Sequence, residues 1–332
     1  AVVDLPRPEQ RDWMDRHCTD PAQRRQLEAL LAAHLRTEPS VLDTPVAALV
    51  DALQVEDTSP VHAWIGQRVG AFRLIEPLGQ GGMAHVFLAE REDVDFQQRV
   101  AVKLLRRGLH SDLQQQLFRR ERQTLAALTH PAIARLIDGG VTEQGVPYLV
   151  MDHVDGLPIT RHAAQHGLDV AARLRLLCEV CRAVDTAHRQ LVVHCDLKPP
   201  NILVAADGTP RLLDFGVARL LDATGDEHEG VASPGLTPGY AAPEQYLGAP
   251  VSTATDVHAL GILLQELLLG EHPDDADVSA RVKGDLAHII AKATAAHPSD
   301  RYASAGELAD ELERYLDHEP IRARVRTPLY RA

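Results

Sequence analysis

The chain has 332 residues, 45% of them hydrophobic, which is enough for one large domain or two modest ones. Its 34 Lys and Arg residues against 47 Asp and Glu residues give a formal net charge of −13. That acidity argues against a nucleic-acid partner and against binding to anionic lipid, because both require clustered basic residues. The longest apolar run, residues 259–269, is too short to span a bilayer, so we expect a soluble chain.

Residues 1–66 are expected to form a helical leader followed by a linker. Their strongest helical pattern covers residues 20–35, where Asp20 is a suitable N-cap, Pro21 suits the first helical position and leucines form one apolar stripe. The segment that follows predicts a loosely ordered linker. The sequence leaves open whether this leader is a clamp, a dimer contact or a docking site.

Residues 67–154 have the pattern of a small lobe with a five-stranded sheet and one long helix. Alternating runs predict strands at residues 72–78, 85–90, 99–105, 133–138 and 147–153. The helix is predicted at residues 111–128. Residues 155–318 are mostly helical in pattern, which indicates a larger helical lobe and an α+β fold.

A glycine-rich stretch lies between the first two predicted strands. Glycines at such a place allow the backbone to pass close to a polyphosphate and to offer it N–H groups. By itself the pattern is equally typical of a tight hairpin. The candidate phosphate-binding residues are Leu78, Gly79, Gln80, Gly81, Gly82, Met83, Ala84, His85 and Val86.

Lys103 follows Ala101 and Val102 on the third predicted strand. A lysine that faces the interior is costly unless a carboxylate and an anion receive it. Glu121, on the predicted helix that follows, is the candidate carboxylate. A lysine on an edge strand is the structural alternative.

The strongest pattern is a loop, residues 194–201, that reads His-Cys-Asp-Leu-Lys-Pro-Pro-Asn and is followed after a short predicted strand by Asp-Phe-Gly. Phosphoryl transfer requires a carboxylate near the attacking hydroxyl, a cation near the moving phosphate and oxygen ligands for Mg2+. Asp196, Lys198 and the pair Asn201 and Asp214 supply these groups in that order. The order and spacing of all these motifs make a chance surface loop a poor explanation.

In these motifs the chain resembles the Hanks-type protein kinases, and specifically the Ser/Thr kinases of bacteria, from about residue 69 to residue 318. Further landmarks of the family are an Ala-Pro-Glu motif that ends at Glu244, then Asp256 and Arg301. The resemblance implies that Asp256 holds the backbone of the loop at residues 194–201 and that Arg301 pairs with Glu244. The resemblance implies a bilobal protein-kinase fold. It also implies transfer of phosphate from ATP, with Mg2+, to Ser or Thr of proteins that include the kinase itself.

The same resemblance assigns roles to the residues around the reacting groups. Asp196 is implied to accept or orient the substrate hydroxyl, and Lys198 to steady the γ-phosphate. Asn201 and Asp214 are implied to hold Mg2+. Tyrosine kinases typically have Ala or Arg where this chain has Lys198, which favours Ser/Thr as the acceptor.

Other residues are implied to bind the nucleotide. Lys103, oriented by Glu121, would hold the α- and β-phosphates. Met151 would be the gatekeeper beside the adenine. The remaining contacts implied are the side chains of Leu78, Val86, Ala101 and Leu203 around the adenine and the backbone of Asp152 and Val154 at its edge.

Cys195 stands where the family usually has an arginine that receives a phosphate of the activation segment. A thiol cannot form that ion pair, so we hypothesise that basal activity does not depend on such phosphorylation. The candidate residues of the activation segment are Thr224, Ser233 and Thr237, of which Thr237 matches a threonine that contacts the catalytic residues. A redox role for the thiol is the alternative.

Two other segments depart from the usual pattern of the family. Residues 270–284 form a short acidic connection where the family usually has a longer loop and a helix, and the acidity predicts either a preference for basic substrates or a solvated loop. Residues 319–332 are basic and indicate either a plain tail or a juxtamembrane stretch. We expect the kinase region in the cytoplasm, with an inner-membrane anchor outside this chain in the second case.

Two further functions stay open beside the active kinase. A nucleotide-binding pseudokinase or signalling scaffold is disfavoured by the complete set of site residues, and a small-molecule phosphotransferase by Glu244 and Arg301. Cys178 and Cys181 have no second pair at zinc spacing and are predicted to be core residues. The expected partners are protein substrates and, for self-association, a second copy of the chain.

Overall fold

The computed structural model describes residues 61–80, 84–93, 97–105, 112–215, 237, 239–270 and 281–324. All of these residues belong to one unit of the chain, Val61–Ala332. The predicted leader helix at residues 20–35 and most of the connection at 270–284 lie outside the described residues.

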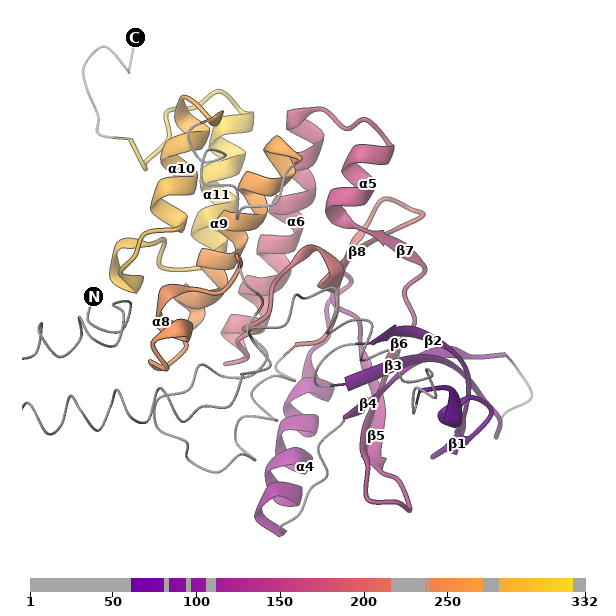
Figure 1. Cartoon of the computed structure of the whole chain (residues 1–332). Coiled ribbons are helices and arrows are strands. Elements are labelled where there is room, and N and C mark those ends of the chain that lie inside the picture. Colours follow the sequence, from indigo (N-terminus) through magenta and orange to yellow (C-terminus); the bar gives the residue numbers. More distant parts are fainter. Residues whose placement is uncertain are drawn as a thin grey trace, which may run out of the picture. The chain divides into compact units, whose positions relative to one another are not determined.

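The small lobe is built on an antiparallel sheet (Figure 1). In the described part of the chain this sheet has six strands in the order β1-β2-β3-β4-β6-β5. The strands are β1 (Arg68–Val69), β2 (Phe72–Gln80), β3 (Ala84–Arg91), β4 (Arg99–Leu105), β5 (Leu136–Val141) and β6 (Pro147–Asp152). The sequence predicted five of them, because the two-residue β1 is too short to show alternation.

The strand predicted at residues 133–138 is wrong in its position along the chain. The strand β5 begins at Leu136, three residues later. Ile133 instead forms a parallel bridge with Leu212, and its neighbour Ala134 donates an N–H to the Leu212 carbonyl at 2.9 Å. The first residues of the predicted strand therefore pair with the other lobe, which local alternation cannot reveal.

The two faces of β4 explain why Lys103 faces the active site. Val100, Val102 and Leu104 belong to a buried cluster on one face, which the residues 61–64 also cover. The opposite face carries Ala101 and Leu105, which pack with Phe118 of the helix α4 (Asp112–Ala127). Lys103 alternates onto this second face because side chains along a strand point to opposite sides in turn.

The large lobe is mostly helical and contains a small sheet in the order β7-β8-β9 (Figure 1). Its strands are β7 (Gly156–Pro158), β8 (Ile202–Ala205) and β9 (Pro210–Leu212). Its helices are α5 (Ile159–Gln165), α6 (Val170–Arg189), α8 (Pro243–Tyr246), α9 (Thr253–Leu269), α10 (Asp285–Ala293) and α11 (Ala305–Leu316), with short 3-10 turns at Pro199–Asn201 and Pro298–Asp300. No helix in the described part of the chain is long and apolar enough to cross a membrane.

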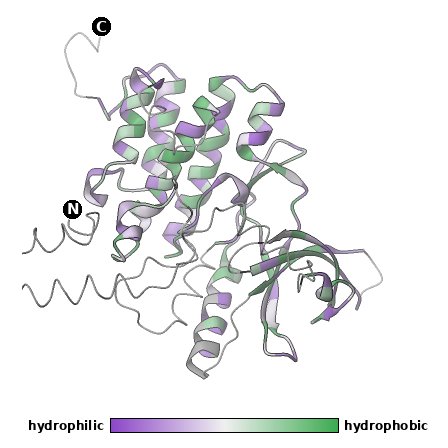
Figure 2. Cartoon of the chain, in the orientation of Figure 1, coloured by the Kyte–Doolittle hydropathy of each residue, from purple (hydrophilic) through white to green (hydrophobic). Residues whose placement is uncertain are grey.

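The helices begin and end at residues suited to those positions. Asp169 caps α6 by accepting the N–H of Ala172 at 2.7 Å, which satisfies a donor that has no partner inside the helix. The helix α9 ends at Gly270, whose φ of 71° lies in the left-handed region that glycine tolerates best. Apolar residues dominate the central helix α9, which is predominantly green in Figure 2.

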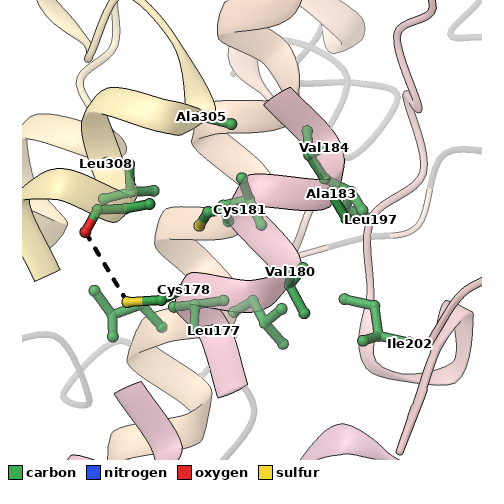
Figure 3. Packing of buried hydrophobic residues seen from close by; sticks show 14 of the residues in the cluster. Leu177, Cys178, Val180, Cys181, Ala183, Val184, Leu197, Ile202, Ala305 and Leu308 are labelled. Carbon is green, nitrogen blue, oxygen red and sulfur yellow. Dashed lines mark hydrogen bonds between the residues drawn. The ribbon is translucent and has the colours of Figure 1, made fainter. Parts of the chain in front are cut away.

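Cys178 and Cys181 lie in the core of the large lobe, as predicted. Both are buried on α6 among apolar side chains (Figure 3). Burial raises the pKa of Cys178 to about 12 and places that of Cys181 well above its ordinary value. The residues that the structure describes contain no group of three or more His, Cys, Asp and Glu that could hold a metal. Their burial among apolar side chains makes Cys178 and Cys181 two small core residues.

The first residues of the basic tail fold back onto the large lobe. Ile321 is 1% exposed and belongs to the core cluster of that lobe. The N–H of Arg322 donates to the carboxylate of Glu311, which is itself buried on α11. Arg324 pairs with Asp285 of α10 at 3.0 Å. Packing of the lobe thus continues at least to residue 324, beyond the predicted boundary at 318.

The substitution Ile321→Ala should lower the free energy of unfolding by about 2–4 kcal/mol, because it leaves a cavity in a closed core. Urea denaturation at pH 7 measures the change. The matched control is Arg322→Ala, an exposed side chain whose loss should change the free energy by no more than about 0.5 kcal/mol. Equal effects of the two substitutions would show that the tail does not belong to the folded lobe.

Candidate active site

The carboxylate of Asp196 is the centre of a hydrogen-bonded cluster in the large lobe. Lys198 Nζ lies 2.9 Å from one of its oxygens, and Asn201 Nδ2 donates to it at 3.0 Å. The other oxygen accepts from Thr237 Oγ1 at 3.1 Å. Asn201 also donates to the backbone carbonyl of Asp196 at 2.8 Å. Three donors thus fix the orientation of this carboxylate.

Lys198 and Thr237 are joined to each other as well as to Asp196. Lys198 Nζ donates to Thr237 Oγ1 at 2.7 Å. The hydroxyl of Thr237 therefore accepts a hydrogen bond from the ammonium group and donates one to the carboxylate. It acts as acceptor and donor at the same time. This contact connects the activation segment, where Thr237 lies, to the loop at residues 194–201.

Asp256 of α9 holds the backbone of that loop. Its two carboxylate oxygens accept the N–H groups of His194 at 2.7 Å and Cys195 at 2.8 Å. His188 of α6 approaches the same carboxylate through Nε2 at 2.8 Å. Asp256 is fully buried, and a buried carboxylate is tolerated only where donors surround it in this way.

His194 connects the loop at residues 194–201, called the catalytic loop below, to the residues before Asp214. Its Nδ1 accepts the N–H of Asp196 at 3.3 Å, so Nε2 carries the proton that is donated to the Leu213 carbonyl at 2.8 Å. The ring of His194 also packs against Phe215, with 4.6 Å between the ring centroids. The sequence motif contained His194, but its spacing did not predict these two contacts.

Lys103 and Asp214 bring the two lobes together. Lys103 Nζ of β4 lies 2.9 Å from an Asp214 carboxylate oxygen, and both side chains are mostly buried. Asp214 has a φ of 61°, a left-handed conformation that is unusual for a residue other than glycine. The predicted partner Glu121 lies in α4, but its side chain is outside the described part of the structure.

Asn201 and Asp214 form a donor set that fits Mg2+. Both Nδ2 protons of Asn201 are used toward Asp196, so its Oδ1 points away from that residue. The carbonyl of Asn201 accepts the N–H of Leu213 at 2.9 Å, which holds the chain segment before Asp214 beside it. An amide oxygen and a carboxylate are hard oxygen ligands, and Mg2+ commonly takes only one or two protein ligands beside phosphate oxygens.

Apolar residues implied to contact an adenine come from both lobes. Ala101 and Met151 are buried against α4, with Val86 packed against the same cluster. Leu78 is 46% exposed although it is a large apolar side chain. Leu203 is half-buried on β8 between two fully buried neighbours.

The structure leaves part of the predicted site undescribed. Asp152 and Val154 lie at the end of β6 and just after it, and the N–H of Asp152 donates to the Arg135 carbonyl at 3.0 Å. Gly79, Ala84 and His85 are described at the ends of β2 and β3. The predicted residues outside the description are Gly81, Gly82, Met83, Thr224, Ser233 and the side chain of Gln80.

Residues 72–320 match the model of the protein kinase domain. The chain belongs to the protein kinase family. A serine/threonine-protein kinase of Mycobacterium tuberculosis, PknB, is 36% identical over 276 residues, which cover 76% of this chain and 44% of PknB. PrkC of Bacillus subtilis is 32% identical over 279 residues, with 77% and 42% covered. The PknI kinase domain of M. tuberculosis superposes with a TM-score of 0.58 at 27% identity, covering 76% of this chain and 98% of that domain.

These relatives identify the kinase as a bacterial serine/threonine protein kinase of the Hanks type, as the sequence motifs predicted. Pkn1 of Myxococcus xanthus supports the same class, with 36% identity over 291 residues that cover 80% of this chain and 41% of Pkn1. The kinase spans less than half the length of these curated relatives.

The end of the activation segment is anchored by Glu244 and Arg301. The guanidinium of Arg301 donates to both carboxylate oxygens of Glu244 at 2.7 Å, and Thr255 adds a hydrogen bond at 2.9 Å. Burial by itself would raise the pKa of Glu244, but the hydrogen bonds from Arg301, a backbone N–H and Thr255 outweigh it and lower the pKa to about 2. The helix α8 is thereby fixed to the large lobe.

The low pKa of Glu244 predicts acid sensitivity of the folded state. Because this pKa lies below its ordinary value of 4.5, the stabilisation is complete above pH 4.5 and is lost as the pH falls toward about 2. The difference in unfolding free energy between wild type and Glu244→Gln should therefore be about 2 kcal/mol smaller at pH 3 than at pH 6.

Denaturant titrations at both pH values measure this difference. The control is Glu313→Gln, which removes a carboxylate from an exposed ion pair with Arg182 and should give a small difference at both pH values. A difference for Glu244→Gln that stays constant from pH 6 to pH 3 would contradict the ionised, Arg301-bound state of Glu244.

Proposed function

We propose that this kinase transfers the γ-phosphate of ATP to Ser and Thr hydroxyls of proteins, itself included, in bacterial signalling. The observation that carries the proposal is the fixed carboxylate of Asp196, with Lys198, Asn201 and Thr237 as its three donors. A carboxylate held beside a cation is the arrangement that phosphoryl transfer to a hydroxyl requires. The serine/threonine kinases among its relatives support the same class of acceptor.

In this proposal each residue of the cluster has one task. Asp196 accepts a hydrogen bond from the acceptor hydroxyl and orients it toward the phosphate. Lys198 places a positive charge where charge develops on the transferred group. Thr237 keeps both side chains in position, since it bonds to each of them.

Lys103 and Asp214 are proposed to bind the nucleotide and its metal. Lys103 would hold the α- and β-phosphates, with Glu121 as its second carboxylate partner, and Asn201 and Asp214 would hold Mg2+. Bound Mg2+ neutralises charge on the phosphates. The 2.9 Å contact between Lys103 and Asp214 supports this assignment, because it places the phosphate-binding cation beside the proposed metal ligand.

The proposed adenine contacts come from Leu78, Val86, Ala101 and Leu203, with Met151 as the gatekeeper. The partial exposure of Leu78 and Leu203 supports a ligand there, since both are apolar side chains that the protein covers only in part. We place the reaction in the cytoplasm and expect protein substrates. Self-association and a membrane anchor outside this chain are further parts of the proposal.

We also propose that the kinase does not require phosphorylation of its activation segment. Cys195 carries a thiol where a phosphate-binding arginine usually stands, so no guanidinium from this position can order the segment. In its place, the buried pair of Glu244 and Arg301 and the contacts of Thr237 connect the end of the segment to the large lobe. These contacts need no phosphate.

Incubation of the purified chain with radiolabelled ATP and Mg2+ should label Ser and Thr residues. The substitution Asp196→Asn should lower the rate on the order of 100-fold or more, because a neutral amide is a weaker hydrogen-bond acceptor for the substrate hydroxyl than a carboxylate. Removal of Mg2+ with a chelator should abolish labelling. No labelling of wild type, with nucleotide binding retained, would favour the pseudokinase instead.

The double variant Thr224→Ala, Ser233→Ala should keep activity within about threefold of wild type, which is below 1 kcal/mol in barrier. In contrast, Thr237→Val should lower kcat by about tenfold or more, because it removes the hydroxyl between Lys198 and Asp196. Thr237→Ser keeps that hydroxyl and serves as the control. Loss of activity in the double variant, restored by acidic residues at the same positions, would contradict independence from phosphorylation.

A further inference from the structure

The backbone around Cys195 is held by side chains from three directions. Its N–H donates to Asp256 Oδ1 at 2.8 Å, and its carbonyl accepts from Gln245 Nε2 at 3.0 Å. The next N–H, that of Asp196, donates to His194 Nδ1 at 3.3 Å. The peptide group between Cys195 and Asp196 is therefore fixed at both its oxygen and its nitrogen. Since the side chain of Asp196 leaves the backbone beside this peptide, its direction depends on the orientation of the peptide plane.

Gln245 is well placed to fix this peptide. It lies on α8, directly after Glu244, whose carboxylate is locked to Arg301 by two hydrogen bonds of 2.7 Å. The amide of Gln245 works in two directions, since its Oε1 accepts the N–H of Ala242 at 2.9 Å while its Nε2 donates to the Cys195 carbonyl. One side chain thus joins the end of the activation segment to the catalytic loop.

The conformation of Cys195 requires such support. Its φ of 67° lies in the left-handed region, which is unfavourable for a residue with a Cβ. A carbonyl in a partly buried position also loses free energy when it has no donor. The hydrogen bond from Gln245 offsets both costs at the residue that precedes the proposed catalytic carboxylate.

We propose that Gln245 is a positioning residue that aims Asp196 by holding the Cys195 carbonyl. In a kinase that lacks the usual arginine at position 195, this bond takes over the connection that a phosphate and that arginine would provide. The inference rests on the proposed independence from phosphorylation and deepens it by naming the contact responsible. Because the bond is made to a backbone carbonyl, it does not depend on which side chain position 195 carries.

Two substitutions separate the two hydrogen bonds of Gln245. Gln245→Glu keeps an oxygen for the Ala242 N–H but cannot donate to the Cys195 carbonyl. Gln245→Lys keeps a donor for that carbonyl but cannot accept from Ala242. If the bond to the catalytic loop is what matters, Gln245→Glu should lower kcat about tenfold with the KM for ATP within about twofold, whereas Gln245→Lys should stay within about threefold in kcat.

Both substitutions are made in the Thr224→Ala, Ser233→Ala background, so that no phosphate on these positions can compensate. The readouts are kcat and the KM for ATP, both measured with casein as the protein substrate, and the melting temperature of each variant. Gln165→Glu on α5 is the control for the added charge, since this exposed side chain lies outside the site. It should leave kcat and KM unchanged.

Each outcome has a separate meaning. An inactive parent double variant would overturn the proposed independence from phosphorylation, and with it the role of Gln245. An active parent whose kcat is unchanged by Gln245→Glu would overturn the role of Gln245 alone. Equal losses of kcat in Gln245→Glu and Gln245→Lys would also overturn it. So would a loss of kcat that parallels a fall in melting temperature, and in both cases Gln245 would only cap α8.

Discussion

The active site depends on one buried carboxylate, that of Asp256. It binds the backbone N–H groups of His194 and Cys195 and is approached by His188, so it fixes the catalytic loop to the two central helices α6 and α9. The helices are held together by a closed apolar core. Burying a carboxylate is unfavourable unless donors satisfy it, and here the donors are the loop itself. The carboxylate is satisfied only when these N–H groups point toward it, so its burial fixes the conformation of the loop.

Two hydrogen-bonded routes lead from Asp256 and its loop to other parts of the site. One runs through His194 to the Leu213 carbonyl and so toward Asp214 and its contact with Lys103 in the other lobe. The other runs through Cys195 to Gln245 and the end of the activation segment. Both routes consist of contacts between unmodified side chains and backbone groups.

The sequence predicted the elements that have strong local patterns, and it failed where pairing partners decide. The strands β2, β3, β4 and β6 were close to their predicted bounds, because each is a short run rich in apolar residues with turn residues near its ends. The start of β5 was wrong because residues 132–134 pair with Leu212 of the large lobe. The packing of Ile321 was also missed, since a single apolar residue in a basic tail has no periodicity.

The sequence by itself determined the family and named the residues that we propose for the reaction, because phosphoryl transfer needs specific groups at fixed spacings within a short loop. Lys103, Asp196, Lys198, Asn201 and Asp214 could all be named on that basis. Only the tertiary structure decided how these groups are held. The family resemblance implied the contacts of Asp256 and Arg301, and the structure confirms them. The resemblance did not imply the bond from Gln245 to the Cys195 carbonyl, which joins residues 50 positions apart. Such contacts depend on how helices pack, and no local pattern of residues encodes that packing.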